Sequence, residues 1–305
     1  DLSGYHKIAV NKAWRIRRDF DSHVFLRSLP EDERPPLSAG MRPVGVKDFS
    51  PILRTAGGIY ITSGSVSMIA GYWSVAHLGL DFLSYYGCDL VFDAKSNAQT
   101  HFYGTGDTGP LVGNFNYNLR QNERSIRLLY WGLMHNCVIT NSSGAPGTLL
   151  AFPKCPIGVE SKLLLEDIFA AKETLRFMRK ASNVWTYELS QRTYAFRDRQ
   201  KVFENDPDAL AAMNAMMDAW QDITPFVDDF KHRVEDLCAA AAQIKTMDRH
   251  VAPSAQLERS KVEYDLVLHV GAPNTKLEAI PDALQLVNGT QRAYKRLEGK
   301  ECRDC

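Results

Sequence analysis

Apolar residues recur at intervals of three and four between residues 161 and 250, and this pattern constrains the fold most. Such spacing places the apolar side chains on one face of an α-helix, and that face must be buried. Pro207 and Pro225 are typical of a first helical turn, which tolerates a missing N–H group. Each follows a residue that can act as an N-cap, Asp206 and Thr224. The segment therefore predicts several amphipathic helices, with Trp220 in the core.

The remaining elements are shorter, and the β component is small. Residues 262–270 alternate between apolar and polar side chains, which predicts a strand with one buried face. Further strands are predicted at residues 59–62, 88–92 and 148–152, and further helices at residues 66–83, 126–137 and 281–297. The predicted class is α+β, mainly α-helical, with amphipathic helices around residues 161–250.

Prolines interrupt the N-terminal part of the chain, at Pro30, Pro35, Pro36, Pro43 and Pro51. Because proline breaks both helices and central strands, residues 1–56 are predicted to form an extended arm or peripheral segment. Residues 57–305 are predicted to form the main globular domain. The arm carries a basic and aromatic cluster that we expect to contact another chain: Trp14, Arg15, Arg17, Arg18 and Phe20. Binding of single-stranded nucleic acid is the alternative reading of such a cluster.

Composition excludes some functions and favours others. Lys and Arg together number 36, as do Asp and Glu, so the net charge gives no indication of nucleic-acid binding. Residues 201–250 are acidic overall and residues 1–54 are basic, which suits either solvated helix faces or complementary patches between subunits. No run of about 18 apolar residues predicts a membrane span. The six cysteines are scattered, which favours a reduced intracellular environment or a virion over secretion.

Three short motifs invite a chemical interpretation. The glycines at 104, 106 and 109 fit the dinucleotide fingerprint, but Pro110 and an Asn-rich segment follow where that fingerprint requires a helix. Cys302 and Cys305 have redox spacing but lie at the end of the chain. The serines at 63, 65 and 67 are interpreted as helix caps rather than nucleophiles. The sequence therefore predicts no cofactor.

His77 and Asp81 are four residues apart on a predicted helix, so their side chains would share a face. A metal site would need a third ligand, such as His101, Asp107 or His135. A histidine hydrogen-bonded to a nearby carboxylate and enclosed by the helix is the more ordinary arrangement. We therefore predict a structural histidine and no metal.

Two functions of different classes follow from these observations. The first is a structural or assembly protein, a self-associating subunit of a capsid-like shell or of a large complex, whose partners are copies of itself or other protein subunits. The second is a soluble enzyme whose site is assembled from distant residues around His77, Asp81, His101 and Asp107. The sequence favours the first because it concentrates no catalytic residues in one motif.

Overall fold

The structure is a computed structural model, and it describes residues 2, 4–17, 19–36, 40–57, 65–88, 120–143, 148, 150–190 and 207–250. The chain divides into two compact units, Asp1–Ala239 and Ala240–Cys305, and the boundary falls within α11 (Thr224–His250). The described residues are mainly helical with small parallel sheets, which confirms the predicted α+β class. The division predicted after residue 56 stays a prediction.

The amphipathic segment forms α7 (Lys162–Ala170), α8 (Lys172–Ser190), α10 (Pro207–Asp222) and α11. Ser161 caps α7, since its Oγ accepts a hydrogen bond from the N–H of Leu164 at 3.1 Å. Pro207 opens α10 as predicted. Trp220 is fully buried, which confirms its predicted place in the core. The spacing of apolar residues in the sequence therefore predicted helices where the structure has them.

The first unit also contains a pair of parallel strands. Strand β4 (Phe82–Tyr85) pairs with β5 (Val138–Asn141), and α6 (Gln121–Met134) lies between them in the chain. A Cβ on Gly132 of α6 would lie 2.9 Å from the side chain of Ile139, so glycine lets the helix pack directly on β5. The connection through a helix is the usual one for adjacent parallel strands.

Several element boundaries differ from the prediction. Helix α3 (Val66–Leu78) ends at Gly79, whose φ of 62° is left-handed, so residues 82–83 belong to β4 rather than to a helix. Residues 138–141 form a strand that was not predicted, directly after the predicted helix 126–137. The predicted strand at 148–152 is wrong for its described residues. The predictions for residues 59–62, 89–92, 262–270 and 281–297 lie outside the described residues.

The N-terminal residues form a second small sheet. Strands β1 (Ile8–Val10), β2 (Ser22–Val24) and β3 (Arg42–Val44) are parallel in that order, with short 3₁₀ turns at Asn11–Arg15 and Glu31–Glu33. Helix α1 (Val46–Thr55) follows and packs on α3. The segment therefore holds more regular structure than its prolines indicate.

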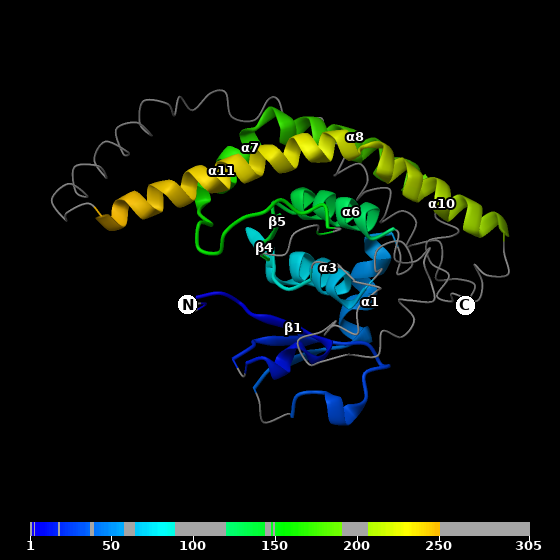
Figure 1. Ribbon diagram of the computed structural model, residues 1–305. Helices are drawn as coiled ribbons and strands as arrows, with labels where there is room; N and C mark the ends of the chain where they lie inside the picture. Colours follow the sequence, from blue (N-terminus) through cyan, green and yellow to red (C-terminus); the bar gives the residue numbers. More distant parts are fainter. Residues whose placement is uncertain are drawn as a thin grey trace, which may run out of the picture. The chain divides into compact units, whose positions relative to one another are not determined.

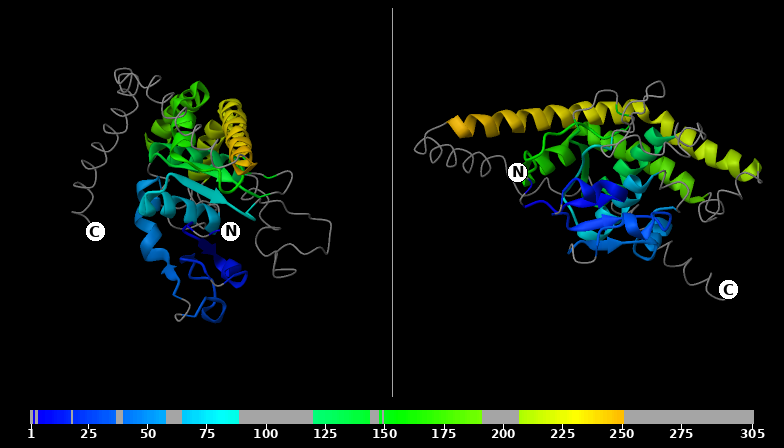
Figure 2. Two further views of the ribbon diagram at one scale, coloured as in Figure 1. Left: turned by 90° about the vertical axis from the view of Figure 1, so that its left-hand side faces the viewer. Right: turned by 60° about the horizontal axis from the view of Figure 1, so that its bottom comes forward.

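Within the first unit, the elements stack in a clear order (Figure 1). Helices α8 and α10 pack on α6, α6 packs on α3, and α3 contacts β1 and β2. The two further views agree that α10 lies on the opposite side of this unit from the N-terminal strands (Figure 2). Helix α6 is thus the central element, and residues 123–133 are buried throughout.

Candidate functional site

The two strands of the β4–β5 pair end side by side, at Tyr85 and Asn141. In open sheets of parallel strands, ligands bind outside the carboxyl ends of the strands. The first turn of α3 lies on the face of this pair to which Tyr85 points, where Tyr85 Oη donates a hydrogen bond to the carbonyl of Ser67 at 2.9 Å. We name this edge the strand-end site, and it comprises Ser65, Ser67, Ser84, Tyr85, Thr140, Asn141, Ser142 and Ser143.

The first turn of α3 offers hydrogen-bond donors to the strand-end site. Ser65 is the N-cap, and its Oγ accepts from the N–H of Met68 at 3.3 Å, which confirms the predicted capping role. The Oγ atoms of Ser65 and Ser67 lie 2.7 Å apart, so one hydroxyl donates to the other. The N–H groups of Val66 and Ser67 have no acceptor within the helix. Such an end of a helix attracts anions.

A chain of hydroxyl groups lies at the ends of the strands. Thr140 Oγ1 donates to Ser84 Oγ at 3.1 Å, and Ser142 Oγ donates to the carbonyl of Cys155 at 2.7 Å. The Oγ atoms of Ser84 and Ser142 are 2.5 Å apart. Because the proton of Ser142 is already donated, Ser84 must be the donor between them. The hydroxyl groups of Thr140, Ser84 and Ser142 each donate their proton within this cluster. The remaining lone pairs on Ser84 and Ser142 can therefore only accept hydrogen bonds.

The segment after β5 holds Ser142 in place. The N–H of Asn141 donates to the carbonyl of Pro153 at 2.8 Å, and the N–H of Cys155 donates to the carbonyl of Asn141 at 3.1 Å. These bonds continue the sheet by one bridge beyond β5. Ser142 and Ser143 are only half-buried, as are Ser84, Ser65 and Ser67. The hydroxyls of the strand-end site are therefore ordered but not sealed in the core.

A second polar cluster lies in the core beside α6. The Nε of Arg127 donates to Glu188 Oε2 at 2.7 Å, and its Nη1 donates to Tyr72 Oη at 2.8 Å. Its Nη2 donates to the carbonyl of Ala56 and to Glu188 Oε1. Trp220 Nε1 donates to Glu188 Oε2 at 2.9 Å. We name these five residues the buried Arg–Glu node.

The node fixes the helices that carry the strand-end site. The Arg127 side chain is 0% exposed and that of Glu188 is 1% exposed, so each charge depends on the other for compensation. Burial raises the pKa of Tyr72 to about 12, although the Arg127 charge opposes this shift. Because Tyr72 is on α3 and Arg127 is on α6, their bond sets these two helices relative to each other.

The structure describes two of the four residues predicted for an enzyme site, His77 and Asp81. His77 is exposed, and its Nε2 lies 2.7 Å from Nη1 of Arg42, so the predicted carboxylate partner and enclosure are wrong. Asp81 lies beyond the end of α3, and its carbonyl accepts from the N–H of Val138. His101 and Asp107 lie outside the described residues. The role of these four residues in an enzyme site stays a prediction.

The predicted interface cluster is partly buried. Trp14 is 8% exposed, packs with Ala9 and Met41, and donates from Nε1 to the carbonyl of Glu33 at 2.9 Å. Phe20 packs partly against the same cluster, and Arg15 lies over the Trp14 ring. Arg18 lies outside the described residues. The role of these residues in contacting another chain stays a prediction.

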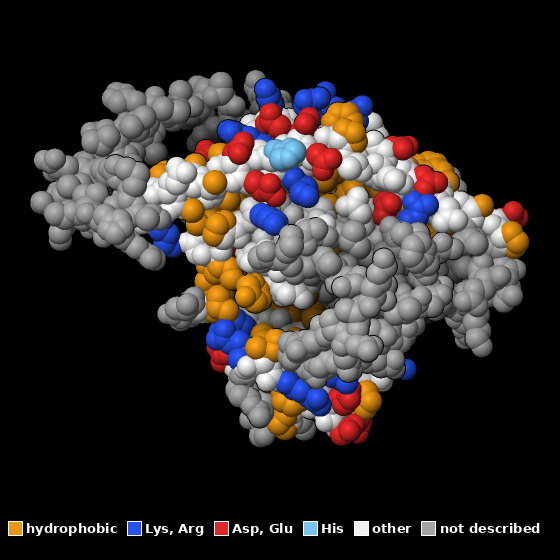
Figure 3. All heavy atoms as spheres, viewed as in Figure 1, with side chains coloured by type: hydrophobic (Ala, Val, Ile, Leu, Met, Phe, Trp, Pro, Cys, Tyr) orange, Lys and Arg blue, Asp and Glu red, His pale blue; other side chains and the backbone are white. Residues whose placement is uncertain are grey.

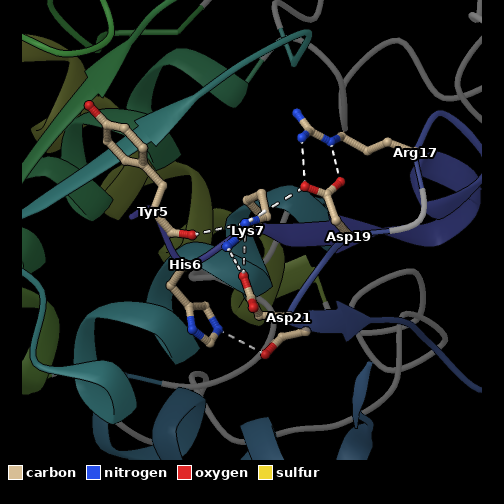
Figure 4. Close-up of polar contacts among 7 residues, drawn as sticks. Tyr5, His6, Lys7, Arg17, Asp19 and Asp21 are labelled. Atoms are coloured by element: carbon tan, nitrogen blue, oxygen red, sulfur yellow. Dashed lines mark hydrogen bonds and ion pairs between the residues drawn. The ribbon is translucent and has the colours of Figure 1, made fainter. Parts of the chain in front are cut away.

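Arg17 belongs to an exposed network of charges at the start of the chain (Figure 4). Its Nη2 donates to Asp19 Oδ2 at 2.6 Å, and Lys7 Nζ lies 3.8 Å from Asp19 and 3.7 Å from Asp21. The N–H of Lys7 also donates to Asp21 at 2.6 Å. Opposite charges are thus neutralised locally, and Arg17 is not an isolated cation.

The surface charges of the acidic segment are also mixed. On the face drawn in Figure 3, acidic and basic side chains lie among one another over the uppermost helices. Exposed side chains on α11 include Asp228, Asp229, His232 and Arg233. This mixture is typical of a solvated helix face.

Comparison of the chain with family models, with curated proteins and with solved structures found no match. Among the described residues, no group of three or more His, Cys, Asp and Glu side chains is placed to hold a metal ion. The helices in that part of the chain include none with the length and apolar character to cross a membrane.

Proposed function

We propose that the strand-end site binds a small phosphate ester with hydroxyl groups on its carbon skeleton. A single observation carries the proposal. Hydrogen-bond acceptors lie on one face of the ends of the parallel strands β4 and β5, and the first turn of α3, with its donors, is bonded to Tyr85 on the other face. A ligand that matches both must accept at one end and donate at the other.

The donors of α3 suit the phosphate group. A phosphate offers only acceptor oxygens at neutral pH, and helix N-termini bind such anions through free N–H groups and the helix dipole. The N–H groups of Val66 and Ser67 and one hydroxyl of the Ser65–Ser67 pair meet this requirement. An uncharged ligand would bind these N–H groups less tightly than a phosphate does, because it gains nothing from the helix dipole.

The hydroxyl chain suits the rest of the ligand. Since Ser84 and Ser142 have no proton left to donate, they accept hydrogen bonds from ligand hydroxyl or amino groups. A few such polar groups at fixed positions give a small-molecule site its orientation and specificity. The proposal is thus a ligand-binding function, with its site at the strand ends, and it assigns no catalytic residue. The assembly role stays a separate prediction, which the mass of the native particle would test.

Titration calorimetry with three probes tests the proposal: glycerol 3-phosphate, inorganic phosphate and glycerol. We expect the wild-type protein to bind glycerol 3-phosphate best, inorganic phosphate less well and glycerol least. Ser67→Ala should weaken both phosphate probes by about three- to tenfold, the effect of one lost hydrogen bond. Ser142→Ala should weaken glycerol 3-phosphate by a similar factor and leave inorganic phosphate unchanged.

Thr186→Ala is the matched control, because Thr186 Oγ1 donates to the carbonyl of Ser182 on the exposed face of α8. It should leave all three affinities unchanged. Absence of phosphate binding in the wild-type protein, or equal losses in Thr186→Ala and Ser67→Ala, would refute the proposal.

A further inference from the structure

We infer that Tyr85 is a positioning residue of the strand-end site, whose hydroxyl holds the first turn of α3 against the end of β4. The inference rests on the proposed function, because it assigns the residue that aims the donors of α3. Tyr85 does not itself supply a group to the ligand, since its side chain is buried. Ser84 thus contributes an acceptor to the site, and Tyr85 positions the donors of α3.

The alternation of β4 explains this division. Successive side chains of a strand point to opposite faces of the sheet. Ser84 points to the face where Thr140 and Ser142 continue the hydroxyl chain. Tyr85 points to the other face, where its Oη donates to the carbonyl of Ser67 at 2.9 Å. Two adjacent residues therefore connect β4 to the acceptor group and to the donor group of the site.

The Tyr85 ring is fixed from several sides. Tyr85 is 7% exposed, and its ring centroid lies 4.7 Å from that of Phe152. A Cβ on Gly71 would lie 2.2 Å from Tyr85 Oη and 2.7 Å from Cδ2 of Leu128. Glycine weakens a helix interior relative to alanine, so its use at this point of α3 has a reason in packing. Gly71 leaves the space that the Tyr85 hydroxyl occupies.

The bond formed by Tyr85 acts where α3 is weakest. The Ser67 carbonyl lies in the first turn, which has the fewest intrahelical bonds of its own. Burial raises the pKa of Tyr85 well above its usual value, so the hydroxyl keeps its proton and stays a donor. A fixed first turn holds the N–H groups of Val66 and Ser67 in one direction. Tyr85 thereby preorganises the donors before a ligand arrives.

Tyr85→Phe tests the inference, because it keeps the ring and removes only the hydroxyl. Amide hydrogen exchange at Met68, Ile69 and Gly71 should become about three- to tenfold faster, as expected for one lost hydrogen bond. Exchange in α6 should not change. The affinity for inorganic phosphate, measured by calorimetry, should fall by a similar factor.

Tyr130→Phe is the matched control, since it also removes a buried phenol hydroxyl but one that bonds Ser182 on α8. It should leave both exchange in α3 and phosphate affinity unchanged. Gly71→Ala should reproduce the effect of Tyr85→Phe by displacing the hydroxyl. Adding Gly71→Ala to Tyr85→Phe should then cause less further change than Gly71→Ala causes alone.

The two readouts separate this inference from the proposed function. If the wild-type protein binds no phosphate, the proposed function fails, and hydrogen exchange still decides whether Tyr85 fixes α3. Exchange in the first turn of α3 that is the same in Tyr85→Phe and wild type would overturn the inference. So would an equal acceleration of that exchange in Tyr130→Phe.

Discussion

The buried Arg–Glu node and the strand-end site are both hydrogen-bonded polar clusters, yet they differ in exposure and in unused capacity. In the node, all three nitrogens of the Arg127 guanidinium and both oxygens of Glu188 have partners, and neither side chain is accessible. In the strand-end site, Ser84 and Ser142 are half-buried, and each accepts only one hydrogen bond among the described residues. The contrast separates polar groups that are saturated and buried in the packing from polar groups that are partly exposed and have acceptor capacity left.

The largest expected effect comes from the node. Glu188→Gln keeps the shape of the side chain but leaves the buried Arg127 charge without compensation, so unfolding free energy should fall by about 3–5 kcal/mol. Urea denaturation measures the change. Glu173→Gln is the control, because its partner Lys172 is 83% exposed, and it should cost less than about 1 kcal/mol. A loss below about 1 kcal/mol in Glu188→Gln would remove the distinction between the two clusters.

Gly57 should be the next most sensitive position. Its φ is 112°, and a Cβ there would lie 2.3 Å from Nη2 of Arg127 and 2.7 Å from Oε1 of Glu188. Gly57→Ala should lower the unfolding free energy by about 2–4 kcal/mol, through backbone strain and displacement of the ion pair. Gly40→Ala has a φ of 71° but nothing within 4 Å, so it isolates the backbone cost at about 1–2 kcal/mol. If Gly57→Ala and Gly40→Ala lose the same free energy of unfolding, measured with heat or urea, the node tolerates the added methyl group.

Alkaline pH should weaken the node. The pKa of Tyr72 is raised to about 12, whereas that of an unfolded tyrosine is about 10. The contribution of a protonated Tyr72 is fully present below pH 10 and is lost as the pH rises towards 12, by about 2–3 kcal/mol. Unfolding of Tyr72→Phe should therefore depend less steeply on pH between about 10 and 12. Identical pH dependence in both proteins would contradict this assignment.

The smallest effect on stability is expected at the strand-end site. Ser84→Ala removes one half-buried hydroxyl and the acceptor of the buried Thr140 hydroxyl, so we expect a loss of about 1–2 kcal/mol, smaller than at the node, together with weaker ligand binding. Urea unfolding of this variant, beside its calorimetric titration, gives both numbers. A stability loss above about 2 kcal/mol would place Ser84 with the structural residues of the node.

Local signals in the sequence predicted the helices well. Ser65 as an N-cap, Pro207 as a helix start and the burial of Trp220 all follow from spacing and capping chemistry that act within a few residues. The sequence did not predict the strand-end site, because β5 is short and directly follows Cys137, which continues the helical spacing of α6. Asn136 has a φ of 57°, and asparagine in this left-handed conformation is typical of a helix end. The asparagine could therefore have indicated that the helix ends before residues 138–141, which form β5.

The pairing of Arg127 with Glu188 could not be read from the sequence. Periodicity shows which face of a helix is buried, but it does not show which other helix covers that face. Arg127 and Glu188 are also 61 residues apart, so no local pattern connects them. The partners of charged residues on buried helix faces can thus be identified from the structure but not from the sequence.

The wide separation of the node's members also has a consequence for synthesis. Arg127 bonds a carbonyl 71 residues before it and a carboxylate 61 residues after it, and Trp220 follows that carboxylate by 32 residues. A nascent chain that has emerged only as far as α6 therefore presents a guanidinium group with no counter-charge to bury it against. Closing such long loops is slow. We therefore expect the bonds of the node to form only after α8 and α10 have been synthesised.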